Sequence, residues 1–194
     1  MELSIFVLSA AALLATPGPT NTLLATAGAG RGVRASVHLL LAELSGYLLA
    51  ILTLRVVLGP VIATTPIVGH ALRVAVVLYL LHLAVALWRH GSASAADVAP
   101  VTFRRVLITT LLNPKAIIFA FTLLPPADEA ARLLPFLIAL GCSTMLIGGG
   151  WIALGATLRH GLGRAVPALL GYRCSAAALA LLACVILAPA LALP

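Results

Sequence analysis

The sequence predicts an all-α integral membrane protein with six transmembrane helices. Hydrophobic residues make up 62% of the 194 residues and charged residues only 9%, against about 45–50% and about 25% in soluble domains. The mean hydropathy is +1.17. In addition, the first and fourth apolar segments are each interrupted by proline and polar residues. This composition excludes a soluble globular domain, because such a domain has no interior large enough to bury so much apolar surface.

Six apolar segments each have about the length that a helix needs to cross ~30 Å of hydrocarbon. They do not alternate in polarity as the strands of a barrel would. The segments are Ser4–Ala27, Val37–Leu58, Ala71–Trp88, Val106–Leu124, Leu133–Leu158 and Cys174–Leu193. Between them we expect loops at Gly28–Gly32, Gly59-Pro60 and Pro125-Pro126.

We expect residues 1–194 to form a single transmembrane transporter domain. Its first half covers about 1–90 and its second half about 101–194. Between the halves, the Ala- and Ser-rich stretch at about 91–100 predicts a flexible cytoplasmic linker.

Basic residues are concentrated on alternate loops. Loops one-two, three-four and five-six hold eight arginines, whereas the other side holds only Arg132. The positive-inside rule then places these three loops in the cytoplasm and both termini outside, in a bacterial inner membrane. The acidic start at Glu2 lacks the basic region of a signal peptide, so we expect a retained first span. We expect Arg55 and Arg73, at the ends of spans two and three, to snorkel to the outer interface.

Span one is broken by the stretch TPGPTNTLL, Thr16–Leu24. Prolines at 17 and 19 remove two helical donors and should free the carbonyls of Leu13 and Ala15. In lipid an unsatisfied carbonyl costs several kcal/mol, so these groups need partners. One interpretation is a kink that neighbouring helices or threonine hydroxyls repair. The other is a polar pathway, because Thr20 and Asn21 follow at once.

Span four is broken in the same way by Asn113-Pro114-Lys115. Pro114 should free the carbonyl of Thr110. A lysine near the middle of a span costs about 3 kcal/mol on insertion scales, and such residues usually face a water-filled or protein-lined pathway.

The two broken spans are the first members of two three-helix halves. An odd number of helices per half predicts a 3+3 inverted repeat, and paired broken helices in such repeats indicate the binding site of a secondary transporter. The predicted pathway residues are Pro17, Gly18, Pro19, Thr20, Asn21, Asn113, Pro114 and Lys115.

These stretches also resemble a known family. TPGPTNTLL, the basic GRGVR loop and FRRVLITTLLNPKAIIFAFTLLPP are similar to the LysE-type amino-acid exporters, a group that includes threonine and homoserine exporters. The resemblance covers essentially the whole chain. It implies a bacterial inner-membrane carrier that exports amino acids or related metabolites and uses the proton motive force. Thr20 departs from the family pattern, in which Asn or Asp follows the P-G-P tripeptide.

Two ionisable side chains lie inside predicted spans. Glu43 in span two is either a proton carrier, the partner of a substrate ammonium, or a structural partner of Lys115 or of a loop arginine. Gly46, Tyr47 and Ala50 share its helix face, which predicts a packed, partly polar interface. Lys115 either binds a substrate carboxylate, pairs with Glu43, or contacts carbonyls freed by the break.

Three glycines, at 141, 148 and 155, recur every seven residues along span five. They predict a stripe where another helix approaches closely, either within the chain, as a gliding surface, or at a contact in a homo-oligomer.

The predicted function is therefore the secondary export of a small molecule, with the lipid bilayer as the second partner. The alternative is an exporter of divalent metal or another small solute with the same architecture. The spacing of Cys and His predicts no metal site, and we expect no cofactor. Scattered arginines argue against nucleic acid. No catalytic dyad or phosphate loop is evident, so we expect no enzyme.

Overall fold

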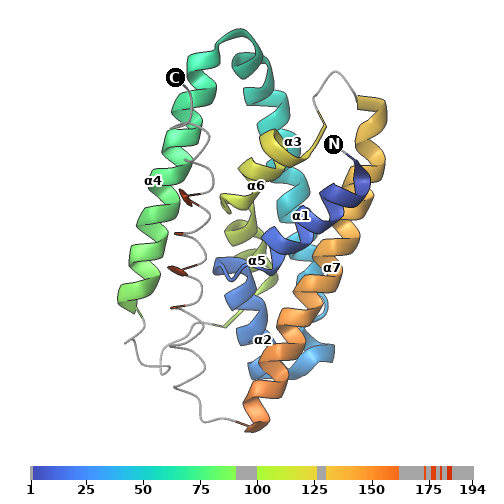
Figure 1. Ribbon diagram of the computed structural model, residues 1–194. Helices are drawn as coiled ribbons and strands as arrows, with labels where there is room; N and C mark the ends of the chain where they lie inside the picture. Colours follow the sequence, from blue (N-terminus) through green and yellow to red (C-terminus); the bar gives the residue numbers. More distant parts are fainter. Residues whose placement is uncertain are drawn as a thin grey trace.

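The computed structural model describes residues 2–90, 100–125 and 130–161, together with the single residues 173, 176, 177, 180, 183 and 184. Within these residues every regular element is a helix, and the helices form an elongated bundle (Figure 1). The predicted all-α class is confirmed. The linker at 91–99 lies outside the described residues. So does the sixth predicted span, apart from five of the single residues, which are helical.

The first predicted span is two helices, α1 (Leu3–Ala15) and α2 (Pro19–Ser36), which meet at a bend of 65°. The fourth is likewise broken, with α5 (Phe103–Leu111) bent by 51° from the segment Lys115–Leu123. That segment comprises α6 (Lys115–Ile118) and the π-helix η2 (Phe119–Leu123). Both predicted breaks are therefore present in the fold.

The second, third and fifth predicted spans are continuous helices. They are α3 (Leu39–Thr64), α4 (Pro66–His90) and α7 (Ala130–Gly161). By length and hydropathy, α3 and α7 are each able to cross a membrane, and the two bent pairs pass the same test if each pair is one span. The inverted relation between the halves stays a prediction.

Two predicted loops are wrong, because both stretches are helical. Gly28–Gly32 lies within α2, where Gly28 packs against α7 and only Gly32, with φ of 80°, departs from helical geometry. Gly59-Pro60 lies within α3, which ends four residues later at Thr64. The break falls at Thr65 because the residue before a proline, here Pro66, is disfavoured in helical geometry.

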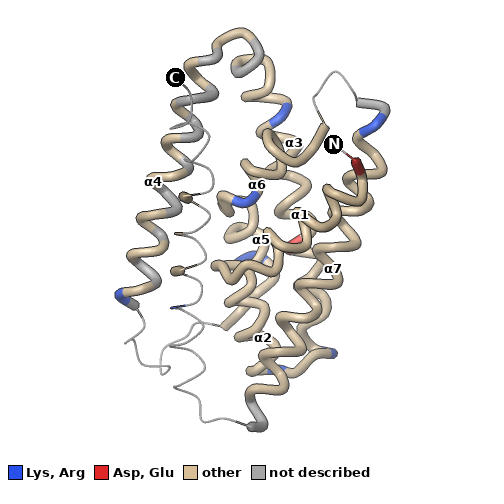
Figure 2. The backbone as a smooth tube through the Cα atoms, in the orientation of Figure 1, with Lys and Arg blue, Asp and Glu red and all other residues tan. Residues whose placement is uncertain are grey.

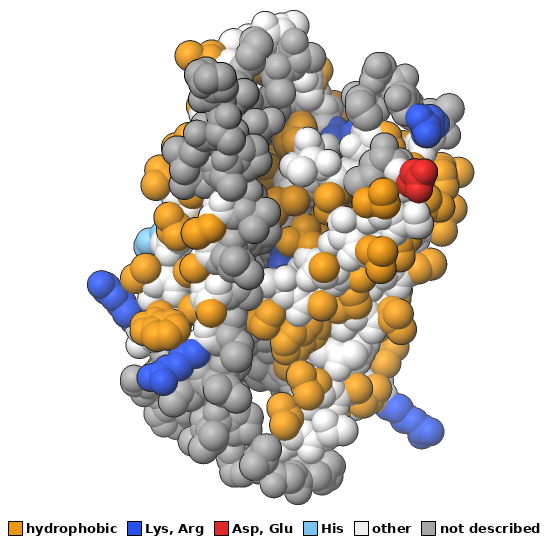
Figure 3. Space-filling model, viewed as in Figure 1, with side chains coloured by type: hydrophobic (Ala, Val, Ile, Leu, Met, Phe, Trp, Pro, Cys, Tyr) orange, Lys and Arg blue, Asp and Glu red, His pale blue; other side chains and the backbone are white. Residues whose placement is uncertain are grey.

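The outer surface of the bundle is apolar. Figure 3 shows hydrophobic side chains spread over the visible face, and Figure 2 shows few charged positions along the length of the tube. Leu8, Val56 and Leu146 are 72%, 75% and 78% exposed. Such exposure is the expected state of side chains that face lipid.

Glycines allow α2 and α7 to touch backbone to backbone. A Cβ added at Gly28 would lie 2.0 Å from the carbonyl oxygen of Ile152, and one at Gly155 would lie 1.9 Å from that of Ala25. Gly148, on the same stripe, packs against α2 and α3 through Leu24, Leu40 and Glu43. The predicted glycine stripe therefore packs within the chain.

Two apolar clusters hold the broken helices in place. One includes an edge-to-face pair between Phe6 of α1 and Phe136 of α7, with ring centroids 5.1 Å apart. In the same cluster Tyr47 of α3 packs against Phe119 at the start of η2. The second cluster joins α2, α3, α5 and α7 around Leu24, Leu39 and Ile152.

Candidate functional site

The break in the first span exposes backbone carbonyls inside the bundle. Thr16 donates its N–H to Ala12 and closes α1, and Pro19 is the first residue of α2. The side-chain amide of Asn21 then donates to the carbonyls of Leu14 at 2.7 Å and Thr16 at 3.0 Å. We predicted free carbonyls at Leu13 and Ala15. Side chains instead bind those of Leu14 and Thr16, because α1 ends here rather than bending, and a helix end leaves its last carbonyls without donors.

The break in the fourth span satisfies part of its own backbone. As predicted, Pro114 has no N–H for the carbonyl of Thr110, and the N–H of Asn113 takes that place at 3.0 Å. The side-chain oxygen of Asn113 accepts from the N–H of Lys115 at 3.1 Å and so caps the next helix. Asn113 is thus the residue that organises this break.

Lys115 joins the two breaks. Its ammonium donates to the carbonyl of Thr16 at 2.5 Å and to that of Leu14 at 3.4 Å. The side chain is only 1% exposed. Of the alternatives for Lys115, contact with carbonyls of a broken helix is the one that the structure shows. Burial of an ammonium is costly, and charge-assisted hydrogen bonds offset part of that cost.

A chain of side-chain hydrogen bonds runs between the two broken spans. Thr110 donates its hydroxyl to the carbonyl of Val106 at 2.9 Å, so it accepts in its 3.1 Å contact with the hydroxyl of Thr20. Thr20 in turn accepts from the amide of Asn113 at 3.2 Å. The same amide donates to the hydroxyl of Tyr47 on α3 at 3.4 Å. Thr20, Asn21 and Asn113 are all buried, so this polar network lies inside the protein.

Gly18 leaves space beside the lysine. Its backbone is extended, with φ of −170°, which any residue can adopt. A Cβ added there would lie 3.6 Å from the ammonium nitrogen of Lys115, in ordinary contact. Because Gly18 has no side chain, a space of about one atom remains beside the ammonium of Lys115.

Glu43 lies apart from these hydrogen bonds, between α3 and α7. It is 1% exposed, and its Oε2 atom has no hydrogen-bond partner. A Cβ on Gly148 would lie 2.4 Å from that atom, so the carboxylate occupies the space that the glycine leaves. One turn earlier on α7, the hydroxyl of Thr144 is also buried without a partner. The predicted partly polar interface on α3 is present, because Gly46 packs against Thr110 and Tyr47 binds Asn113.

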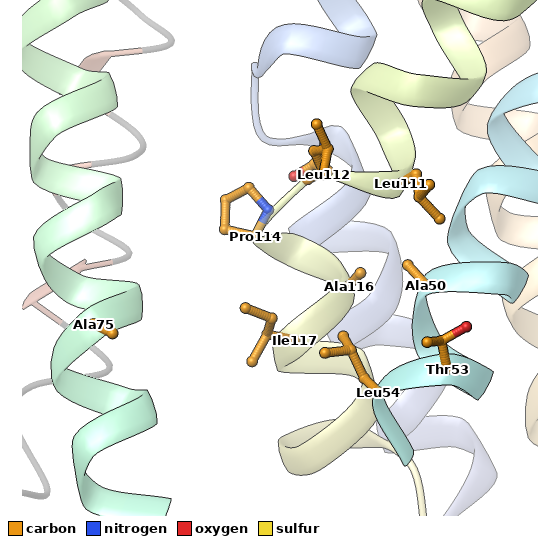
Figure 4. Close-up of a pocket in the computed structure, with 10 residues that line it drawn as sticks. Ala50, Thr53, Leu54, Ala75, Leu111, Leu112, Pro114, Ala116 and Ile117 are labelled. Carbon is orange, nitrogen blue, oxygen red and sulfur yellow. The ribbon is translucent and has the colours of Figure 1, made fainter. Parts of the chain in front are cut away.

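A cavity of about 520 Å³ opens beside the break in the fourth span. Its walls come from α3, from the end of α5, from α6 and from α4 (Figure 4). Asn113 and Pro114 are the predicted site residues that line it. The lining residues are Ala50, Thr53, Leu54, Ala75, Leu111, Leu112, Asn113, Pro114, Ala116 and Ile117.

Two polar contacts at the site were missed by sequence reasoning. From the sequence, Thr110 was considered only for the carbonyl that Pro114 frees, yet its hydroxyl also contacts that of Thr20 across the break. Arg55 was expected at the outer interface, and that stays a prediction. Its guanidinium donates to the carbonyls of Ala120 in η2 and of Pro125 just after it. The signal was the pair Pro125-Pro126, since prolines offer no N–H to the carbonyls of the preceding turn.

No group of three or more His, Cys, Asp or Glu side chains gathers anywhere in the described part of the chain. A family model described as LysE type translocator matches residues 11–193, which include both broken spans. No curated protein and no solved structure matches the chain.

Proposed function

The chain belongs to the LysE type translocator family, and from this membership we propose that it is a secondary exporter of amino acids or related small metabolites. Membership makes it a multi-pass membrane translocator of small solutes. The solute class, the driving force and the bacterial inner membrane as its location are our proposals.

The observation that carries the proposal is the bond between the two breaks. Lys115 of the fourth span reaches the carbonyl of Thr16 in the first span, deep inside the bundle. Secondary transporters bind their solutes at such paired discontinuous helices. A purely structural kink would not require a buried lysine.

The solute carboxylate would bind at the ammonium of Lys115. An ammonium has three donors, and two of them are used by the carbonyls of Leu14 and Thr16. The space beside Gly18 lies next to the same nitrogen. A carboxylate there would supply the negative charge that the buried lysine otherwise lacks, and this match favours zwitterionic solutes.

Glu43 would carry the coupling proton. Its Oε2 is buried without a hydrogen-bond donor, a setting in which a carboxylate binds a proton readily. Lys115 is the other buried ionisable side chain among the acidic and basic residues of the described helices. Proton binding at Glu43 and carboxylate binding at Lys115 would therefore influence each other through their charges.

The basic loops would face the cytoplasm. Arg31, before the Gly32 kink of α2, donates to the carbonyl of Val101, just before α5. This bond connects the first and the second basic stretches of the chain at one end of the bundle. The bond supports the placement of both basic stretches on the same side of the membrane, as the positive-inside rule requires.

The test is efflux from proteoliposomes that contain the purified chain. Vesicles are loaded with a panel of radiolabelled amino acids, and release is measured with and without an imposed pH gradient. We expect release of at least one amino acid, faster with the gradient. A parallel panel loaded with Zn²⁺ or Mn²⁺ tests the metal alternative. If no amino acid leaves the vesicles, the proposal is wrong.

A further inference from the structure

We propose that the cavity beside the break in the fourth span receives the side chain of the solute, and that this exporter selects neutral amino acids with aliphatic side chains. The inference rests on the proposed export of amino acids and adds its specificity.

The cavity has the size and lining of a small-molecule site. Its volume of about 520 Å³ falls within the roughly 300–1,000 Å³ that ligand pockets occupy. Of the ten lining residues, all except Thr53 and Asn113 have apolar side chains, and none is charged. Ile117 lies on the side of its helix that faces Ala75 of α4, and Ala116 lies beside Ala50 of α3 (Figure 4). An aliphatic group would be transferred into this space favourably.

The end of α5 supplies acceptors at the edge of this cavity. In a continuous helix the N–H groups of Lys115 and Ala116 would bind the carbonyls of Leu111 and Leu112. Here both N–H groups bind Asn113 instead, one its side-chain oxygen and the other its carbonyl. Leu111 and Leu112 both line the cavity. Their carbonyls therefore lack their helical donors and suit the donors of an α-ammonium, because a carbonyl without a donor needs another partner in a membrane.

Asn113 connects the cavity to the polar network. The residue lines the cavity, and its amide donates to Thr20 and Tyr47. Pro114, the N-cap of the short helix that follows, and Ala116 on that helix line the cavity, whereas Lys115 reaches towards the first span. Asn113 thus belongs both to the apolar cavity and to the polar network between the two broken spans.

The lining also disfavours charged solute side chains. A lysine or glutamate side chain would lose its water in the cavity without meeting an opposite charge, since none of the lining residues is ionisable. Taking an unpaired ion out of water is costly, whereas a tenfold change in rate corresponds to only about 1.4 kcal/mol. We therefore expect leucine to be released at least tenfold faster than lysine or glutamate.

The experiment uses the full chain in proteoliposomes loaded with equal concentrations of leucine, alanine, lysine and glutamate. Ala75→Phe fills the cavity from α4. It should slow leucine release by about tenfold or more and alanine release less. The matched control is Leu78→Phe, on the same helix but 62% exposed and outside the lining, which should leave release unchanged.

A binding measurement separates this inference from the proposed function. Leucine should raise the unfolding temperature of the detergent-purified chain, and Ala75→Phe should abolish the rise. An equal rise in both proteins overturns the cavity assignment. Release of lysine or glutamate as fast as leucine also overturns it, while amino-acid export itself stands. If no amino acid is released, the proposed function fails first.

Discussion

The ammonium of Lys115 hydrogen-bonds the backbone carbonyl of Thr16, ninety-nine residues earlier in the chain. This bond connects the interruption of one span with the interruption of another. It also gives the buried lysine a polar partner that does not neutralise its charge, so the site retains its attraction for anions.

Replacing Lys115 with Ala should reduce export by at least about 10–100-fold, because a charge-assisted hydrogen bond contributes about 1.5–3 kcal/mol. The measurement is efflux at matched protein amounts, with membrane levels checked by immunoblot. Arg34→Ala, which removes an exposed positive charge, is the control and should export normally. Wild-type export by Lys115→Ala would remove the lysine from the mechanism.

Replacing Glu43 with Gln should make export insensitive to an imposed pH gradient. A gradient of one pH unit supplies about 1.4 kcal/mol per proton, or about tenfold in accumulation. That stimulation should be lost, while exchange of labelled for unlabelled solute continues, because the amide keeps the shape of the acid. Glu2→Gln, at an exposed position before α1, serves as the control. Full stimulation in Glu43→Gln would show that the proton travels elsewhere.

The hydrogen-bond chain between Thr20 and Thr110 should appear as an energetic coupling. Thr20→Val removes the acceptor of the Asn113 amide and the donor to Thr110, at a cost of about 1–3 kcal/mol. Thr110→Val removes the other end. A double-mutant cycle measured by chemical unfolding should give a coupling of about 0.5–3 kcal/mol. If the effects of the two substitutions on the free energy of unfolding are strictly additive, the hydrogen bond between Thr20 and Thr110 contributes nothing to stability.

Adding a methyl group at Gly28 or Gly155 should destabilise the bundle. Each Cβ would fall about 2 Å from a carbonyl oxygen of the facing helix, and overpacking costs about 1–3 kcal/mol or more. The unfolding temperature in detergent should drop for both alanine variants. Gly150→Ala is the matched control on α7, since a Cβ there meets nothing within 4 Å. A similar drop in the control would point to a general effect of helix substitution.

Adding a methyl group at Gly18 should lower export without lowering the stability of the protein. The extended backbone accepts alanine and the Cβ makes an ordinary 3.6 Å contact with Lys115, so stability should not fall. Export should fall, because the methyl occupies the space that we assign to the solute carboxylate. Normal export by a stable Gly18→Ala protein would place the carboxylate elsewhere.

The class of the fold and the positions of both breaks could be predicted from the sequence. Hydropathy reports lipid exposure directly, and Pro17, Pro19 and Pro114 each remove a helical donor that no other residue type removes. The ends of helices were less predictable. Gly28 reads as a helix breaker by propensity, yet its lack of a side chain serves the contact with α7, and packing outweighs propensity.

The site residues were identified by type, but their partners could not be. That Lys115 would bind Thr16 rather than Glu43 depends on how the two broken spans lie in space, which no local pattern records. The same holds for the Thr20–Thr110 contact and for Arg55, whose partners are 65 and 70 residues away. The apolar cavity is formed by α3, α4 and the fourth span together, so the sequence of no single segment predicts it.

The reciprocal glycine contacts between α2 and α7 have a mechanical consequence. A carbonyl of each helix packs against a glycine of the other. Neither helix can therefore slide along its axis without a collision between backbones. We therefore expect α2 and α7 to move together as one rigid unit. Motion of α1 relative to these two helices would then be taken up at Thr16–Gly18, the three residues that join α1 to α2.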